Sequence, residues 1–166
     1  MKALRLSIKC IAFLLTASCA APSAWHLDTI ATGDPAFDSS RLHYSTNSSH
    51  LKLEMLRIGQ EISAFVFLKQ HRFTPSALDP ASVDIALLIN GETIRELAPS
   101  REGRMRLRLS KPLTERLINA LQEGKQVDIV LDGFQEKISP DSFAKRYEEL
   151  TQERWEFMNF IKGPFG

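Results

Sequence analysis

Side chains that commonly carry catalysis or bind metals are few in this chain, and their spacing points to no metal or catalytic centre. The four histidines are His26, His43, His50 and His71. No two of them lie three or four residues apart, as paired ligands on one helix would. A zinc or copper site assembled by folding stays open, but the spacing favours histidines scattered over a surface. Ser23, Ser40 and Ser63 lack the context of a nucleophile elbow, and no glycine-rich phosphate loop precedes a predicted helix. We therefore expect no metal, no cofactor and no catalytic residue. The protein is predicted not to be an enzyme, with an uncharacterised hydrolase as the alternative.

Two groups of residues indicate interaction surfaces. Arg104, Arg106 and Arg108 occupy every second position, which predicts a strand with a basic outer face. Such a face could contact peptidoglycan, anionic headgroups or an acidic partner. The alternative is the solvated side of a half-buried strand. Trp155 and Met158 fall off the main apolar stripe of the C-terminal segment, so they predict a second apolar patch, with packing in the core as the alternative.

The first nineteen residues combine charge, hydrophobicity and small side chains in the order of an export signal. Three basic residues fall within the first nine positions, and the apolar run 11–15 follows them. This run is too short to span a membrane, which takes roughly 20 apolar residues. Small or short side chains at positions 16–18 then lead to Cys19.

The segment Leu15-Thr16-Ala17-Ser18-Cys19 resembles the lipobox of bacterial lipoprotein precursors, although that family more often has Leu where Thr16 stands. In that family, the cysteine thiol receives diacylglycerol, the chain is cleaved just before the cysteine, and the new amino terminus is often acylated, commonly with palmitate. The resemblance implies lipid attachment at Cys19 and a membrane bound through N-terminal acyl chains. Ala20, in place of Asp, resembles the pattern sorted to the outer membrane.

Two other fates of the leader stay open. Ordinary signal peptidase could cut after Ala20, using Ser18 and Ala20 as its small-residue pair, and release a soluble periplasmic or secreted protein. The leader could also remain uncleaved as a short anchor.

Removing residues 1–18 changes the charge of the chain. The precursor carries 21 basic and 20 acidic residues, and three of the basic ones lie in the leader, so the remainder has 18 basic and 20 acidic residues. This net charge of −2 excludes an overall basic surface for nucleic acid. Cys19 is then the only cysteine, so an internal disulfide is excluded. The remaining 148 residues suffice for one modest domain with its own core.

The apolar pattern divides the chain into three parts. Residues 1–18 form the signal peptide, residues 19–49 the lipidated N-terminus and tether, and residues 50–166 a single α+β domain. Within the tether, Leu42 and Tyr44 could begin a short strand. In the domain, alternating or continuous apolar runs predict strands at 51–55, 62–68, 83–89, 94–97, 105–109, 127–131 and 134–138. Asn90-Gly91 and Asp132-Gly133 predict tight hairpin turns.

Two helices complete the predicted domain. Ser110 is a suitable N-cap for a short helix that ends near Gly124, and Ser139-Pro140 begins a long C-terminal helix. Because strands and helices do not alternate regularly, we predict an antiparallel sheet or small β-sandwich of the α+β class. The protein is predicted to be a lipid-anchored interaction or structural module of the bacterial envelope, located at the outer membrane, with an envelope protein or peptidoglycan as partner. The alternative is a soluble periplasmic or secreted binding protein.

Overall fold

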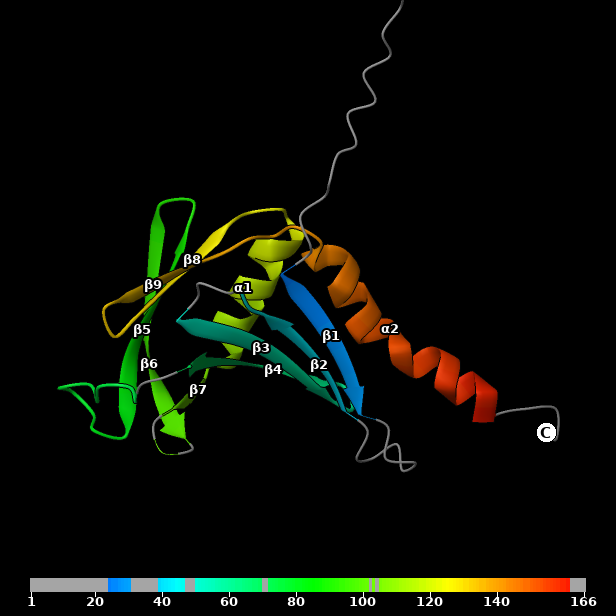
Figure 1. Ribbon diagram of the computed structural model, residues 1–166, viewed down its shortest axis with the longest axis horizontal. Helices are drawn as coiled ribbons and strands as arrows, with labels where there is room; N and C mark the ends of the chain where they lie inside the picture. Colours follow the sequence, from blue (N-terminus) through cyan, green and yellow to red (C-terminus); the bar gives the residue numbers. More distant parts are fainter. Residues whose placement is uncertain are drawn as a thin grey trace, which may run out of the picture.

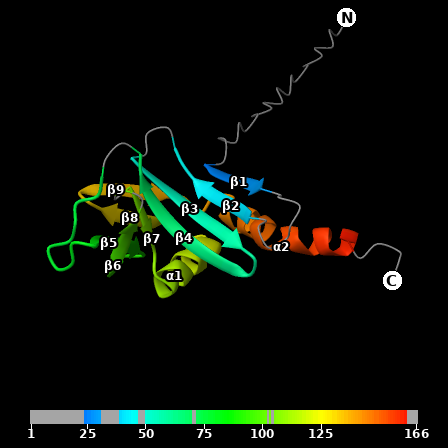
Figure 2. The same ribbon diagram turned by 90° about the horizontal axis from the view of Figure 1, so that it is seen from below.

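The chain folds into one long, bent antiparallel sheet with two helices packed on it (Figures 1 and 2). This computed structural model describes residues 24–30, 39–46, 50–69, 72–101, 103 and 105–161, and their side chains except those of 101 and 153–161. The described strands are β1 (Trp25–Ile30), β2 (Ser39–Tyr44), β3 (Leu51–Ile58), β4 (Glu61–Leu68), β5 (Ser82–Ile89), β6 (Glu92–Arg101), β7 (Arg106–Arg108), β8 (Val127–Leu131) and β9 (Phe134–Ile138). The helices are α1 (Lys111–Gln122) and α2 (Phe143–Ile161).

The strands follow the order β1-β2-β3-β4-β7-β6-β5-β8-β9, and every neighbouring pair is antiparallel. β6 joins two halves of the sheet because its residues 92–99 pair with β5, while Ser100 and Arg101 pair with β7. The short strand β7 also pairs with β4, so it connects β1–β4 to the second half. This arrangement folds β5, β8 and β9 back toward the first four strands.

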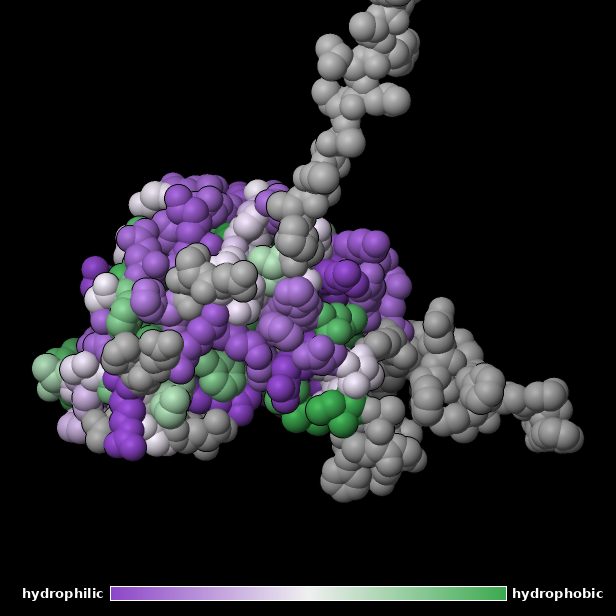
Figure 3. Space-filling model, in the orientation of Figure 1, coloured by the Kyte–Doolittle hydropathy of each residue, from purple (hydrophilic) through white to green (hydrophobic). Residues whose placement is uncertain are grey.

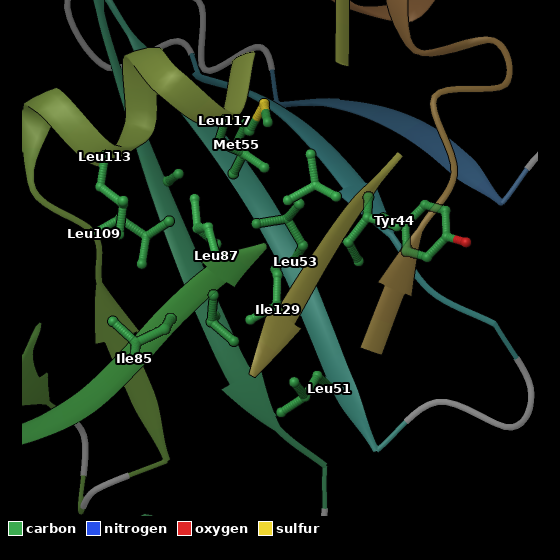
Figure 4. Close-up of a cluster of buried hydrophobic side chains, with 14 of the residues drawn as sticks. Tyr44, Leu51, Leu53, Met55, Ile85, Leu87, Leu109, Leu113, Leu117 and Ile129 are labelled. Carbon is green, nitrogen blue, oxygen red and sulfur yellow. The ribbon is translucent and has the colours of Figure 1, made fainter. Parts of the chain in front are cut away.

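The core lies between the two halves of the sheet and beneath α1. Figure 4 shows Ile85 and Leu87 of β5 and Ile129 of β8 facing Leu51 and Leu53 of β3. Helix α1 covers this cluster with Leu113, Leu117 and Leu121, which recur every four residues and are at most 3% exposed. Burial of such aliphatic side chains, at about 1.5–3 kcal/mol each, is the main source of stability in a chain of this kind.

The structure has the helix cap and the hairpin turns at the residues that the sequence predicts. Ser110 Oγ accepts a hydrogen bond from the Leu113 amide at 3.2 Å and caps α1. Asn90-Gly91 and Asp132-Gly133 both adopt positive φ at their two positions, as a tight antiparallel hairpin requires. Gly124, at φ +74°, follows the end of α1 in the left-handed conformation.

The predicted α+β class is wrong, because the described chain is mostly antiparallel sheet with helices in a minor role. The prediction combined the sheet with a short helix and a long C-terminal helix, whereas the described helices are short relative to the sheet. Among the described side chains of α2, the buried apolar ones are Phe143 and Leu150, both in its first half. Together with the half-buried Tyr147, they cover one end of the sheet.

The prediction also placed too few strands in the range 19–49, which was expected to be a tether. β1 was not predicted, and β2 spans Ser39–Tyr44, where only a short strand at Leu42 and Tyr44 was expected. Polar residues interrupt the apolar pattern there, and the burial of these strands comes from distant partners. The Trp25 ring of β1 packs at a tilted angle against Tyr44, with ring centres 5.0 Å apart, and against Phe143 of α2, with ring centres 4.8 Å apart. Its indole Nε1 donates to the Ser139 carbonyl at 2.8 Å. These contacts cannot be read from the local sequence.

Candidate functional site

The most distinctive surface is the side of β1–β4 and β7 that points away from the core, here called the outer face. The strand register places these side chains on it: His26, Asp28, Ile30, Arg41, His43, Lys52, Glu54, Leu56, Ile58, Glu61, Ser63, Phe65, Phe67, Arg106 and Arg108. Figure 2 shows α1 and α2 together on the opposite side of β1–β4. Among the described residues, no helix or strand packs on the outer face.

Glu54 lies at the centre of the outer face and is only 3% exposed. Among the described side chains, three cations approach its carboxylate. Arg41 Nε and Lys52 Nζ lie 3.5 and 3.7 Å from Oε2, and Arg106 Nη2 lies 3.5 Å from Oε1. A carboxylate removed from water is costly unless it is paired, which explains why cations from three strands converge on it.

Two phenylalanines hold Arg106 over this carboxylate. The Arg106 guanidinium carbon lies 3.8 Å from the ring centre of Phe65 and 5.0 Å from that of Phe67. Stacking on an aromatic face orients a guanidinium and stabilises it by about 0.5–1 kcal/mol at a partly exposed site. The ring pair and Glu54 therefore fix the position of a positive charge on the sheet surface.

A shallow groove of about 200 Å³ lies next to the Glu54 cluster. Its lining consists of Leu56, Ile58, Glu61, Ser63, Phe65 and Arg108. Arg108 Nη2 donates to Glu61 Oε1 at 2.8 Å and to Ser63 Oγ at 3.0 Å, so it forms a fixed polar wall. Ile58 is 53% exposed beside it. The groove thus offers an apolar floor with a charged edge, and Figure 3 shows apolar patches interrupting an otherwise hydrophilic surface.

His43 occupies the margin of the outer face. Its Nδ1 lies 3.4 Å from Asp28 Oδ2, and its ring lies 5.3 Å from that of His26. Burial is the largest influence and lowers the pKa of His43, and the positive charge of Lys52 lowers it further. Asp28 raises this pKa, while His26 and Arg41 lower it. The net effect keeps His43 neutral at pH 7.

The structure brings together only part of the predicted interaction surface. Arg106 and Arg108 both point to the outer face of β7, with Leu107 buried between them, as the alternation predicts. Arg104 and Cys19 lie outside the described residues. Trp155 and Met158 belong to α2, but their side chains are outside the described part, so the second apolar patch remains a prediction.

The residues that organise the outer face were not recognised from the sequence. Lys52 and Glu54 alternate with the apolar residues of β3, so their position on the solvent side of that strand was predictable. Arg41 follows the same alternation in β2. The convergence of these three residues with Arg106 was not predictable, because β7 follows β4 by nearly forty residues and still pairs with it.

Other features of the described residues give weaker indications. A groove of about 410 Å³ on the second half of the sheet includes Asp84, Arg95 and Asp132 in its lining, but Asp132 already accepts a hydrogen bond from the Thr74 amide at 3.1 Å. In the described part of the chain, no three histidine, cysteine or acidic side chains are arranged to hold a metal ion. None of the helices found among the described residues has the length and apolar character needed to cross a bilayer.

Comparison of the chain with protein-family models, with curated proteins and with solved structures gives no match. The functional interpretation therefore depends on the chemistry of the outer face and on the sequence motifs. The outer face supplies fixed positive charge beside an apolar groove, an arrangement suited to binding an anionic group that carries an apolar neighbour.

Proposed function

We propose that this protein is a lipid-anchored module of the bacterial envelope, attached at the outer membrane through Cys19, that works by binding another envelope component. The observation that carries the proposal is the Leu15–Cys19 motif, whose cysteine precedes the first strand residue, Trp25, by six positions. A chain of that length reaches at most about 20 Å, so acyl chains at Cys19 would keep the domain close to the bilayer.

The outer face supports a binding role for the folded part. Its charges are held by Glu54, by aromatic stacking and by Ser63, and a groove lies beside them. Pre-positioned charges lose little conformational entropy when a partner binds, which favours recognition. An envelope protein or peptidoglycan is the kind of partner that a module tethered in this place would meet.

Replacement of Cys19 by Ala tests the anchor. Cells that express the full chain are grown with labelled palmitate, and label in the purified protein is measured for the unchanged chain, Cys19→Ala and Cys10→Ala. We expect loss of label only in Cys19→Ala, because the Cys10 thiol lies inside the leader that is removed. Equal labelling of the Cys19→Ala chain and the unchanged chain would contradict the proposal.

The second candidate is a soluble periplasmic or secreted binding protein, favoured by the small residues Ser18 and Ala20. Mass spectrometry of the mature amino terminus separates the two candidates. An acylated Cys19 supports the anchored form, and a free amino group at Ala21 supports the soluble form.

A further inference from the structure

The Glu54 cluster contains more positive than negative charge. Arg41 and Lys52 both approach the same carboxylate oxygen, Oε2, while Arg106 is nearest to Oε1. One carboxylate therefore faces three cations among the described side chains. Arg41 Nε is buried and makes no hydrogen bond within the described part of the chain. A second anion placed beside Arg41 and Lys52 would offset part of this excess, and their side chains are 40% and 29% exposed.

The apolar groove begins level with Arg41, and its far end lies two residues along the sheet from that arginine. Arg41 stands opposite Leu56 in the register of β2 and β3, and Ile58 follows two residues further along β3. Two residues along a strand correspond to roughly 7 Å. The same spacing separates alternate side chains of any extended peptide, so a carboxylate and an aliphatic side chain two residues apart would match both features.

We infer that the outer face binds an extended acidic segment of a protein partner, with a carboxylate beside Arg41 and Lys52 and an aliphatic side chain in the groove of Leu56 and Ile58. The inference deepens the proposed function by naming the chemistry of the partner. It relies on charge complementarity and on the spacing of the two features.

A protein segment fits this surface better than a lipid bilayer does. The carboxylates of Asp28 and Glu61 stand at the margin of the outer face, and their side chains are 60% and 72% exposed. A flat anionic membrane would bring many headgroups against these carboxylates, and like charges repel. A peptide with a single carboxylate brings less negative charge against Asp28, which stands opposite Arg41 in the register of β1 and β2. The groove is also concave, which suits one side chain better than a planar surface.

Fluorine NMR of a small labelled peptide tests the inference on the full-length protein in detergent. The probe is trifluoroacetyl-Glu-Ala-Leu-amide, and its matched controls carry Gln in place of Glu or Ser in place of Leu. We expect saturable broadening of the probe signal at up to ~10 mM, with roughly fivefold weaker binding of each control peptide. Binding should also weaken as salt is added, because the charges are partly exposed.

Variants of the protein place the peptide on the outer face. Arg41→Gln should weaken binding of the probe roughly fivefold, whereas Arg116→Gln, an exposed arginine on α1, should leave it unchanged. Circular dichroism confirms that both variants are folded. Three results would each overturn the inference: the Gln peptide binds as well as the probe, Arg41→Gln binds the probe as the unchanged protein does, or no saturable binding is seen.

Two further measurements exclude other occupants. Co-sedimentation with phosphatidylglycerol vesicles that is lost in Arg41→Gln and is not displaced by the peptide would assign the outer face to lipid. Self-association that is lost in Arg41→Gln would assign it to a second copy of the chain. Either result overturns the inference.

Failure of the lipid anchor is a separate outcome, because Cys19→Ala protein in the same detergent should bind the peptide as the unchanged protein does.

Discussion

Glu54 is a glutamate on the solvent-facing side of a strand, yet its side chain is only 4% exposed. Cations from β2, β3 and β7 close over it, and Phe65 supports one of them. Because the cations belong to three strands, the carboxylate links strands that are distant in the sequence. Because this carboxylate is buried, replacing one of its oxygens by an amide nitrogen would disturb the arrangement of charges on the outer face.

Replacement of Glu54 by Gln should therefore destabilise the protein. The amide keeps the shape of the side chain but leaves three neighbouring cations without their counter-charge, at a cost of about 1–3 kcal/mol in the free energy of unfolding. Urea unfolding followed by circular dichroism measures this change. The matched control is Glu61→Gln, whose carboxylate is 72% exposed and should matter little. Equal effects of the two substitutions would contradict the role assigned to Glu54.

His43 should add a pH dependence to stability. Its pKa in the folded protein is lowered below 6.5, first by burial and then by Lys52. The unfolded chain therefore binds the proton more readily, and stability that is present above 6.5 is lost as the pH falls through the folded pKa. We expect His43→Gln to lose less stability than the unchanged protein between about pH 7 and pH 5. Urea unfolding at both pH values checks this, and parallel losses in the two proteins would disprove it.

Sequence alternation placed Arg106 and Arg108 on an outer face, but it could not identify Glu54 as the partner of Arg106. A period of two assigns a side chain to one side of its own strand. The neighbours on that side depend on which strands pair, and β7 pairs with β4 across an intervening hairpin. The sequence could therefore predict that a basic face exists, but it could not predict which side chains that face brings together.

At the scale of elements, α1 was the most predictable segment because its signals are local. Ser110 caps the helix, and its Oγ also donates to Glu96 Oε2 at 2.5 Å. The same carboxylate accepts from the Ser110 amide at 3.0 Å. These bonds join the start of α1 to β6.

Loss of the Ser110 hydroxyl should weaken both the cap and this connection. We expect Ser110→Ala to lower the free energy of unfolding by about 1–2 kcal/mol, within the range for lost N-caps. Ser110→Thr retains an oxygen that can accept and donate, so it should stay close to the unchanged protein. Thermal or urea unfolding of the two variants provides the measurement. Similar stabilities of Ser110→Ala and Ser110→Thr would show that the cap is unimportant.

The hairpins were predictable for the same reason, since Asn90-Gly91 and Asp132-Gly133 define their turns by themselves. β1 and β2 were not. Their apolar residues are sparse, and a strand such as β1 is stabilised by partners that a local pattern does not contain. The fold class was predicted wrongly because a long amphipathic period shows that a helix forms. It does not show how much of the sheet that helix covers.

At the scale of the whole molecule, the fold connects the two ends of the described chain. Trp25 in the first strand is 1% exposed and contacts Phe143 at the start of α2. Tyr44 Oη donates to the Lys137 carbonyl at 3.2 Å and adds a second link between β2 and β9. These contacts between residues more than ninety positions apart make the sheet one cooperative unit.

The place of β1 at the edge of the sheet has a mechanical meaning. A lipid anchor at Cys19 would transmit any pull to the domain through β1, which among the described strands pairs only with β2. A force across the strand would open the pairs one at a time, beginning at Trp25, whereas a force along the strand would load all six pairs together. Trp25 is also held by ring contacts with Tyr44 and Phe143 and by its hydrogen bond to the Ser139 carbonyl. Tension would thus enter the fold at Trp25, whose contacts must break before the remaining pairs of β1 can separate from β2, so the rate of forced unfolding would depend on the release of one tryptophan.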